Sequence, residues 1–137
     1  MARYLLDTQA TVWLLNGDKR LPENIRENIE YRTYRYTVSV LSLMEIVQLM
    51  ALKKISTKPL ADIEEALMRY DVDIIGMNME ILEAFQQLPM LTIDGKLHSD
   101  PFDRILIAIC IKHRFTMVSA DQKFPEYRKH GLTLIEI

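Results

Sequence analysis

Four acidic residues stand at positions from which carboxylates could act together on one substrate: Asp7, Glu45, Asp103 and Asp121. Carboxylates within a few ångströms of one another raise each other's pKa values unless positive charge lies between them. Mg²⁺ or Mn²⁺ would supply that charge, because both ions prefer oxygen ligands. The lone Cys110 and three dispersed histidines offer no zinc-type ligand spacing. Divalent ions held by carboxylates activate water for phosphodiester hydrolysis, so the four acids, if they converge, predict a metal-dependent hydrolase.

Two of these acids follow predicted strands, and each has an ordinary structural alternative. Asp7 comes directly after the apolar segment 3–6, where it or Thr8 could cap the next helix. Asp121 comes after segment 115–119, where it could form a turn. Because the carboxyl ends of parallel strands meet at one edge of a sheet, we expect both acids at the same edge.

The other two acids stand in predicted helices. Glu45 is the only acid of the apolar segment 40–50, so it must face water or a site, and a buried carboxylate there would need a cation. Asp100-Pro101-Phe102-Asp103 is typical of the N-cap, N1, N2 and N3 positions of a helix. Asp103 could reach back to the N-cap amide, and the helix dipole would also hold it ionised for a metal.

Strands and helices alternate along the chain. We predict strands at 3–6, 36–40, 72–75, 115–119 and 132–135, and helices at 9–15, 22–30, 42–53, 60–70, 78–88 and 101–113. This order is typical of an α/β fold with a mostly parallel sheet covered by helices on both faces. Residues 1–137 contain no repeat or linker, so we expect a single domain.

The composition is that of a globular protein, with 49% hydrophobic and 26% charged residues. No uncharged run approaches the roughly 18 residues of a membrane-spanning helix, and the first apolar run is too short for a signal peptide. We therefore expect a cytoplasmic protein with Cys110 buried and no membrane partner. The net charge of −2 argues against a nucleic-acid partner. Residues 1–57 and 101–137 nevertheless each carry an excess of basic side chains, and the chain apart from the four acids is net positive.

Three segments resemble the PIN-domain family and, within it, the VapC-type toxins of toxin–antitoxin pairs. They are Leu5-Leu6-Asp7-Thr8, Ser39-Val40-Leu41-Ser42-Leu43-Met44-Glu45-Ile46, and His98-Ser99-Asp100-Pro101-Phe102-Asp103-Arg104-Ile105-Leu106-Ile107-Ala108, the last followed by Asp121 in Ser119-Ala120-Asp121. The resemblance covers nearly the whole chain. Gln9, Met44 and Leu49 stand where the family commonly has His, Trp and Lys, but none of the four carboxylates is lost.

The resemblance implies a three-layer α/β/α sandwich and a Mg²⁺- or Mn²⁺-dependent endoribonuclease. It also implies a homodimer that a cognate antitoxin holds inactive. The four acids would form the metal site, with Asp121 acting through water or at a second ion and the other three binding directly. Thr8 and Ser119 would steady these ligands by hydrogen bonds, and Arg104 would pair with an acid or approach a phosphate.

Weaker signals and rival classes complete the interpretation. Tyr31-Arg32-Thr33-Tyr34-Arg35-Tyr36 could bind RNA by stacking bases and contacting phosphates through Arg32 and Arg35, although such a pattern is more often a solvated turn whose tyrosines pack on neighbours. A haloacid-dehalogenase-like phosphatase or a receiver-like module would need paired acids where the chain has Asp7-Thr8-Gln9. The remaining alternative is a non-catalytic PIN-like domain that binds RNA or protein, which has no chemical need for four repelling carboxylates.

Overall fold

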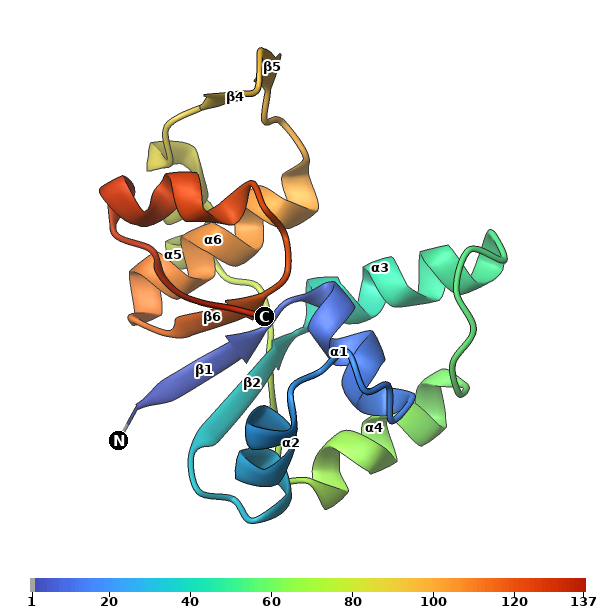
Figure 1. Ribbon diagram of the computed structural model, residues 1–137. Helices are drawn as coiled ribbons and strands as arrows, with labels where there is room; N and C mark the ends of the chain where they lie inside the picture. The colour runs from blue at the N-terminus through green and yellow to red at the C-terminus, as the bar shows by residue number, and fades with distance from the viewer. Residues whose placement is uncertain (1) are drawn as a thin grey trace.

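Five parallel strands form the central sheet of the computed structural model, which describes residues 2–137 (Figure 1). They are β1 (Arg3–Leu6), β2 (Arg35–Ser39), β3 (Asp73–Ile75), β6 (Thr116–Ser119) and β7 (Thr133–Glu136), in the order β3-β2-β1-β6-β7. In the central strand, Leu6 is in register with Val38 of β2 and Val118 of β6. The carboxyl ends of these three strands therefore meet at one edge, as we predicted.

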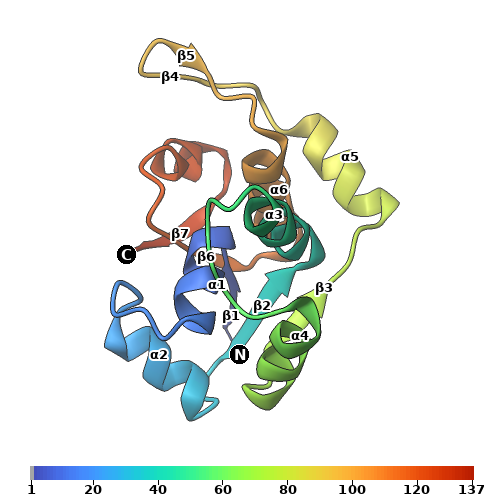
Figure 2. The ribbon, with the colours of Figure 1, turned by 90° about the vertical axis from the view of Figure 1, so that its right-hand side faces the viewer.

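Helices cover both faces of this sheet (Figures 1 and 2). One face carries α1 (Thr8–Leu15), α2 (Glu23–Glu30), α3 (Val40–Ala51) and α4 (Leu60–Arg69), and the other carries α5 (Met79–Gln87), α6 (Pro101–His113) and the 3₁₀ helix η1 (Phe124–His130). Successive strand residues point to opposite faces, so Leu6 packs in the core with α1 to α4 and Leu5 packs in the core with α5 and α6. The predicted α/β/α sandwich around a parallel sheet is confirmed.

The predicted elements are all present, with ends that differ by at most two residues. The shift is clearest at α3, which begins at Val40 because the Ser39 hydroxyl accepts a hydrogen bond from the Leu41 amide at 3.1 Å. Two features were not predicted. One is η1, and the other is the antiparallel hairpin of β4 (Thr92–Ile93) and β5 (Lys96–Leu97), which projects beyond α5 and α6 in Figure 1.

Two further expectations concern apolar segments. Cys110 is buried in α6, as predicted, and burial raises the pKa of its thiol, so it packs as a small apolar side chain. Within residues 2–137, no helix combines the length and the hydrophobicity that crossing a membrane requires.

Candidate active site

Asp7 occupies the junction between β1 and α1. Its Oδ1 accepts a hydrogen bond from the Ala10 amide at 2.8 Å, so Asp7 is the N-cap of α1. Its Oδ2 accepts a hydrogen bond from the Ser119 hydroxyl at the end of the neighbouring strand β6. Only 5% of Asp7 is exposed. The capping role and a role in a site therefore coexist in one side chain.

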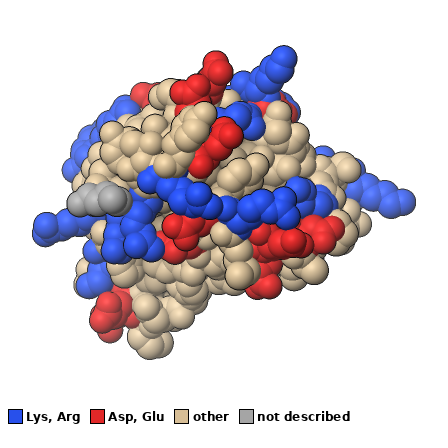
Figure 3. Space-filling model, turned by 90° about the horizontal axis from the view of Figure 1, so that it is seen from below, with Lys and Arg blue, Asp and Glu red and all other residues tan. Residues whose placement is uncertain are grey.

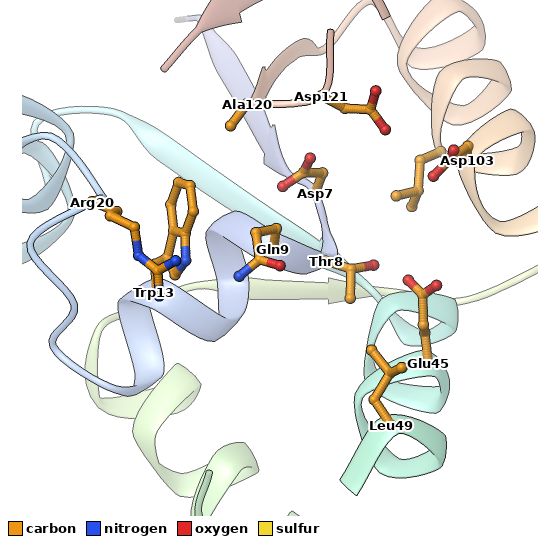
Figure 4. A pocket seen from close by; sticks show the side chains of 11 residues that line it. Asp7, Thr8, Gln9, Trp13, Arg20, Glu45, Leu49, Asp103, Ala120 and Asp121 are labelled. Carbon is orange, nitrogen blue, oxygen red and sulfur yellow. The ribbon is translucent and has the colours of Figure 1, made fainter. Parts of the chain in front are cut away.

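Glu45 lies one turn into α3, and its carboxylate points towards Asp7 and Asp103 (Figure 4). Among residues 2–137, no hydrogen bond or ion pair engages this carboxylate. The side chain is partly exposed, so the full burial that would have required a compensating cation does not occur. Thr8 donates a hydrogen bond to the Ser42 hydroxyl at 3.1 Å, which ties the start of α1 to α3 rather than holding a carboxylate directly.

Asp103 stands in the first turn of α6. Asp100 is the N-cap, accepting hydrogen bonds from the amides of Phe102 at 2.9 Å and Asp103 at 3.2 Å. The predicted return bond from the Asp103 carboxylate to the N-cap amide is not formed in the described chain. The Asp103 Oδ2 lies instead 3.1 Å from the Nε2 of His98, a residue of the same family-like segment to which the sequence analysis gave no role.

Asp121 follows β6 and closes a tight turn. Its Oδ1 accepts a hydrogen bond from the Lys123 amide at 2.8 Å, which is the turn-forming role that we weighed against a metal role. The Lys123 ammonium lies 3.7 Å from its Oδ2. The Asp121 amide donates to the Ser119 hydroxyl at 3.0 Å, so Ser119 links the backbone of this turn to the carboxylate of Asp7.

All four acids line one cavity of about 400 Å³ (Figure 4). The other residues around this acid cavity are Thr8, Gln9, Trp13, Arg20, Leu49, Leu106 and Ala120. Within residues 2–137, no three acidic, His or Cys side chains are already close enough to share one ion. The carboxylates therefore surround an open space at the carboxyl edge of the sheet instead of collapsing onto one another.

Two of the carboxyl groups in this cavity, those of Asp7 and Asp103, have raised pKa values. Burial raises the pKa of Asp7 to about 6; the charges of Asp121 and Asp103 add to the rise, and the hydrogen bonds from Ser119 and the Ala10 amide oppose it. Burial also raises the pKa of Asp103, against the lowering effect of its bond to His98. A divalent cation in the cavity would remove both the repulsion and part of the desolvation penalty.

Two cavity residues were missed because their role depends on a loop. Arg20 lies between α1 and α2, with its guanidinium 5.1 Å from the ring centroid of Trp13 and 2.7 Å from Asp18. Trp13 is buried, as expected of a core residue, and also forms part of the cavity wall. Sequence spacing alone offers no signal for this contact, because Gly17 follows the helix end with a positive φ of 61° and redirects the chain.

Arg104 does not approach the cavity. Its side chain is buried, donates a hydrogen bond to the Leu88 carbonyl at 2.8 Å, and lies 4.7 Å from the ring centroid of Phe85. The implied pairing with an acid or a phosphate is therefore not found. Arg104 instead holds α6 against the end of α5.

Arg32 and Arg35 lie at the opposite edge of the sheet from the acids. Arg35 begins β2 and forms an ion pair with Asp73 of β3 at 2.8 Å, and Arg32 donates to the Arg69 carbonyl at 2.8 Å. Figure 3 shows the face that contains the amino ends of β1 and β2, where basic side chains form a band flanked by acidic ones. The structure thus separates the predicted RNA-binding arginines from the acid cavity.

Comparisons with known proteins bear on the family and on the fold. The sequence profile of the PIN domain matches residues 4–130. A comparison with curated proteins gave no match.

Among solved structures, the fold is similar to VapBC from Salmonella typhimurium bound to DNA, with a TM-score of 0.67, 19% identity, and coverage of 99% of this chain and 98% of that chain. It is also similar to VapBC2 from Rickettsia felis bound to a promoter DNA fragment, with a TM-score of 0.65, 17% identity and 98% of each chain covered. A toxin–antitoxin complex from Klebsiella pneumoniae gives a TM-score of 0.62 at 16% identity, with 98% of this chain and 99% of that chain covered. At these identities the likeness establishes a shared fold.

Proposed function

Because the chain belongs to the PIN-domain family, we propose that it is a Mg²⁺- or Mn²⁺-dependent endoribonuclease toxin that a cognate antitoxin neutralises. The observation that carries this proposal is the meeting of four carboxylates from four segments around one cavity. A domain that only bound RNA or protein would gain nothing from burying Asp7 beside other acids, where its pKa rises to about 6. A hydrolase that binds a divalent ion would use these neighbouring carboxylates as metal ligands.

The side chains around the cavity fit a hard divalent ion, because all the negatively charged donors that converge there are carboxylate oxygens. In this proposal Asp7, Glu45 and Asp103 hold the ion directly, and Asp121 acts through water or at a second ion. When bound, the ion would lower the pKa of a water molecule and stabilise charge on the reacting phosphate. Ser119 keeps one oxygen of Asp7 in place, so the orientation of that carboxylate does not depend on the substrate.

Arg20 supports the assignment of a phosphodiester substrate. It brings a guanidinium to the wall of a cavity otherwise dominated by negative charge, and guanidinium groups bind phosphate oxygens with several N–H donors. The ring of Trp13 supports the guanidinium from one side. We assign Arg20 to an RNA phosphate next to the scissile bond, and Arg32 and Arg35 to a second, weaker RNA contact at the amino edge.

The toxin role extends the proposal beyond catalysis. The similar folds include VapBC structures and a toxin–antitoxin complex, and we carry that partnership over to this chain as a homodimer bound by an antitoxin in the cytoplasm. Large apolar side chains are exposed on α3, among them Met44 and Val47. Exposed apolar patches of this kind mark protein interfaces.

The decisive experiment is cleavage of total cellular RNA by the purified protein with Mg²⁺ or Mn²⁺, with EDTA as the metal-free arm and the cut ends mapped. Discrete metal-dependent cuts are expected from the wild type and none from Asp7→Asn. Asp94→Asn is the matched control, because Asp94 is an exposed hairpin residue with a φ of 51°, a conformation that Asn also tolerates.

Each outcome assigns the protein to a class. Cuts that persist in Asp7→Asn or in EDTA would identify a contaminating or metal-independent nuclease. Metal binding without cuts would point to a missing substrate or to retained antitoxin, which a denatured and refolded preparation would separate. Absence of both metal binding and cleavage would favour the non-catalytic PIN-like domain.

A further inference from the structure

Behind Asp103 runs a buried hydrogen-bonded chain that the acid cavity itself does not include. The Tyr127 hydroxyl of η1 lies 2.7 Å from Nδ1 of His98, and Nε2 of His98 lies 3.1 Å from Oδ2 of Asp103. Tyr127 is 0% exposed and His98 is 5% exposed. Three segments of the molecule therefore join in a single row of polar contacts that ends at the cavity.

The partners of His98 define the direction of these bonds. The Asp103 carboxylate can only accept, so Nε2 of His98 carries the hydrogen of this contact and donates it to Oδ2. The Tyr127 hydroxyl can donate or accept and so matches Nδ1 with or without a hydrogen. The two contacts together fix Nε2 as a donor and hold the ring in one orientation.

Contacts with aromatic rings also restrain the imidazole of His98. The ring lies edge-on to Tyr127 with centroids 5.4 Å apart and is tilted against Phe124 at 6.5 Å. The His98 amide donates to the Leu91 carbonyl at 2.8 Å, which anchors the backbone at the base of the hairpin loop. Because the position of the His98 ring is restrained in this way, its Nε2–H can in turn fix the orientation of the Asp103 carboxylate.

Asp103 needs such an anchor. Asp100 already accepts the amide hydrogens at the start of α6, and within residues 2–137 the contact with His98 is the hydrogen bond that engages the Asp103 carboxylate. Its side chain is 21% exposed. Without the His98 donor, the carboxylate could occupy other rotamers and turn away from the cavity.

We propose that His98, oriented by Tyr127, is the positioning residue of the metal site: it binds Oδ2 of Asp103 and thereby presents Oδ1 to a divalent ion. This inference rests on the proposed function, since it assumes that Asp103 is a metal ligand. Outer hydrogen-bond partners of metal ligands act on affinity by orienting the ligand. His98 itself does not touch the ion or the RNA in this scheme.

The test measures Mn²⁺ affinity of the whole protein by calorimetry, alongside RNA cleavage and thermal unfolding in EDTA. His98→Phe keeps a ring of similar size but removes the donor, and should weaken Mn²⁺ binding by about 10- to 100-fold. His98→Gln offers an amide N–H near the position of Nε2 and should recover most of that loss. Unchanged Mn²⁺ affinity in His98→Phe, or a loss of equal size in His98→Gln, would overturn the proposal.

A second pair of variants keeps the inference testable if His98→Phe does not fold. Tyr127→Phe removes only the hydroxyl that orients His98 and should weaken Mn²⁺ binding by about threefold. Tyr36→Phe is its matched control, because Tyr36 is also buried and its hydroxyl has no hydrogen-bond partner in the described chain. Equal Mn²⁺ affinities for the two Tyr variants would contradict the role of Tyr127.

The outcomes separate this inference from the proposed function. A wild-type protein that still binds Mn²⁺ but leaves total cellular RNA intact after it has been denatured and refolded free of antitoxin would overturn the ribonuclease, while the Mn²⁺ affinities of the variants would still decide the role of His98. A wild-type protein that binds no Mn²⁺ would overturn both.

Discussion

The two edges of the sheet carry charge in opposite ways. At the amino edge, Arg35 and Asp73 are both about half exposed and neutralise each other, so folding there leaves little electrostatic strain. At the carboxyl edge, Asp7 is buried and lies near two further acids, which together with burial raise its pKa to about 6. The Arg35–Asp73 pair at the amino edge is neutralised within the chain, whereas Asp7 at the carboxyl edge is buried without a basic partner among the described residues.

Of the substitutions considered, Asp7→Asn should have the largest effect, because it removes the buried charge at the carboxyl edge of the sheet. We expect RNA cleavage to fall on the order of 10³-fold or more, because a metal ligand is lost. The metal-free protein should at the same time gain stability of about 3 kcal/mol at neutral pH, because Asn carries no charge that folding must bury.

The pH dependence of that gain follows from the sign of the shift. Below the ordinary pKa of 3.8, Asp7 is protonated in both the folded and the unfolded chain, so the variant and the wild type should be equally stable. As pH rises from 3.8 to about 6, the unfolded chain ionises first and the wild type loses stability. Urea unfolding in EDTA across this range would measure the difference, and a variant less stable than wild type at neutral pH would contradict the argument.

Asp103→Asn should remove metal binding with little change in folding. The amide oxygen introduced by this substitution would still accept the hydrogen bond from His98, so the free energy of unfolding should change by less than about 1 kcal/mol. Mn²⁺ titration and thermal melts in EDTA would measure the two effects separately. A grossly unfolded variant would restore a purely structural role for Asp103.

Arg20→Ala should test whether Arg20 contacts a phosphate of the RNA substrate. We expect KM for RNA to rise about tenfold with a smaller change in kcat, because a phosphate contact made before and during the reaction is lost. Lys19→Ala is the control, since Lys19 is its exposed neighbour and does not line the acid cavity. Equal effects of the two substitutions would mean that Arg20 contributes only general positive surface charge and makes no specific phosphate contact.

Removal of both Arg32 and Arg35 should have the smallest effect. Replacing them with Ala should weaken RNA binding by about threefold and lower the slope of log affinity against log salt by about 1 to 2, if both contact phosphates. Binding titrations at several salt concentrations would measure this, with Lys53 and Lys54 replaced by Ala as the control of equal charge. Affinity and slope equal to wild type would remove the amino edge from the RNA-binding surface.

The convergence of the four acids on one cavity could be predicted from the sequence because their positions depend on local rules. Asp7 and Asp121 follow strands, and parallel strands bring their carboxyl ends together. Asp103 belongs to a recognisable helix start, and Glu45 stands out as a charge in an apolar helix. The hairpin also has a signal in the sequence, because Asp94-Gly95 favours a type I′ turn, and both residues have positive φ, 51° and 77°.

The contacts of His98 and Arg20 could not be predicted in the same way. His98 meets Tyr127 across 29 residues of sequence, and that meeting depends on how η1 folds back over α6. Arg20 reaches Trp13 through the conformation of a loop. The implied contact of Arg104 with an acid or a phosphate is not found for a related reason. Its neighbour in sequence, Asp103, faces the cavity, while Arg104 faces the end of α5. Side-chain direction on a helix start is decided by tertiary packing rather than by sequence distance.

The burial of Asp7 also has an evolutionary side. In the proposed ribonuclease, a single substitution there would abolish cleavage and make the metal-free fold more stable, so nothing in the requirement to fold protects the activity. Selection for stability and selection for the proposed cleavage would therefore act in opposite directions at this one position.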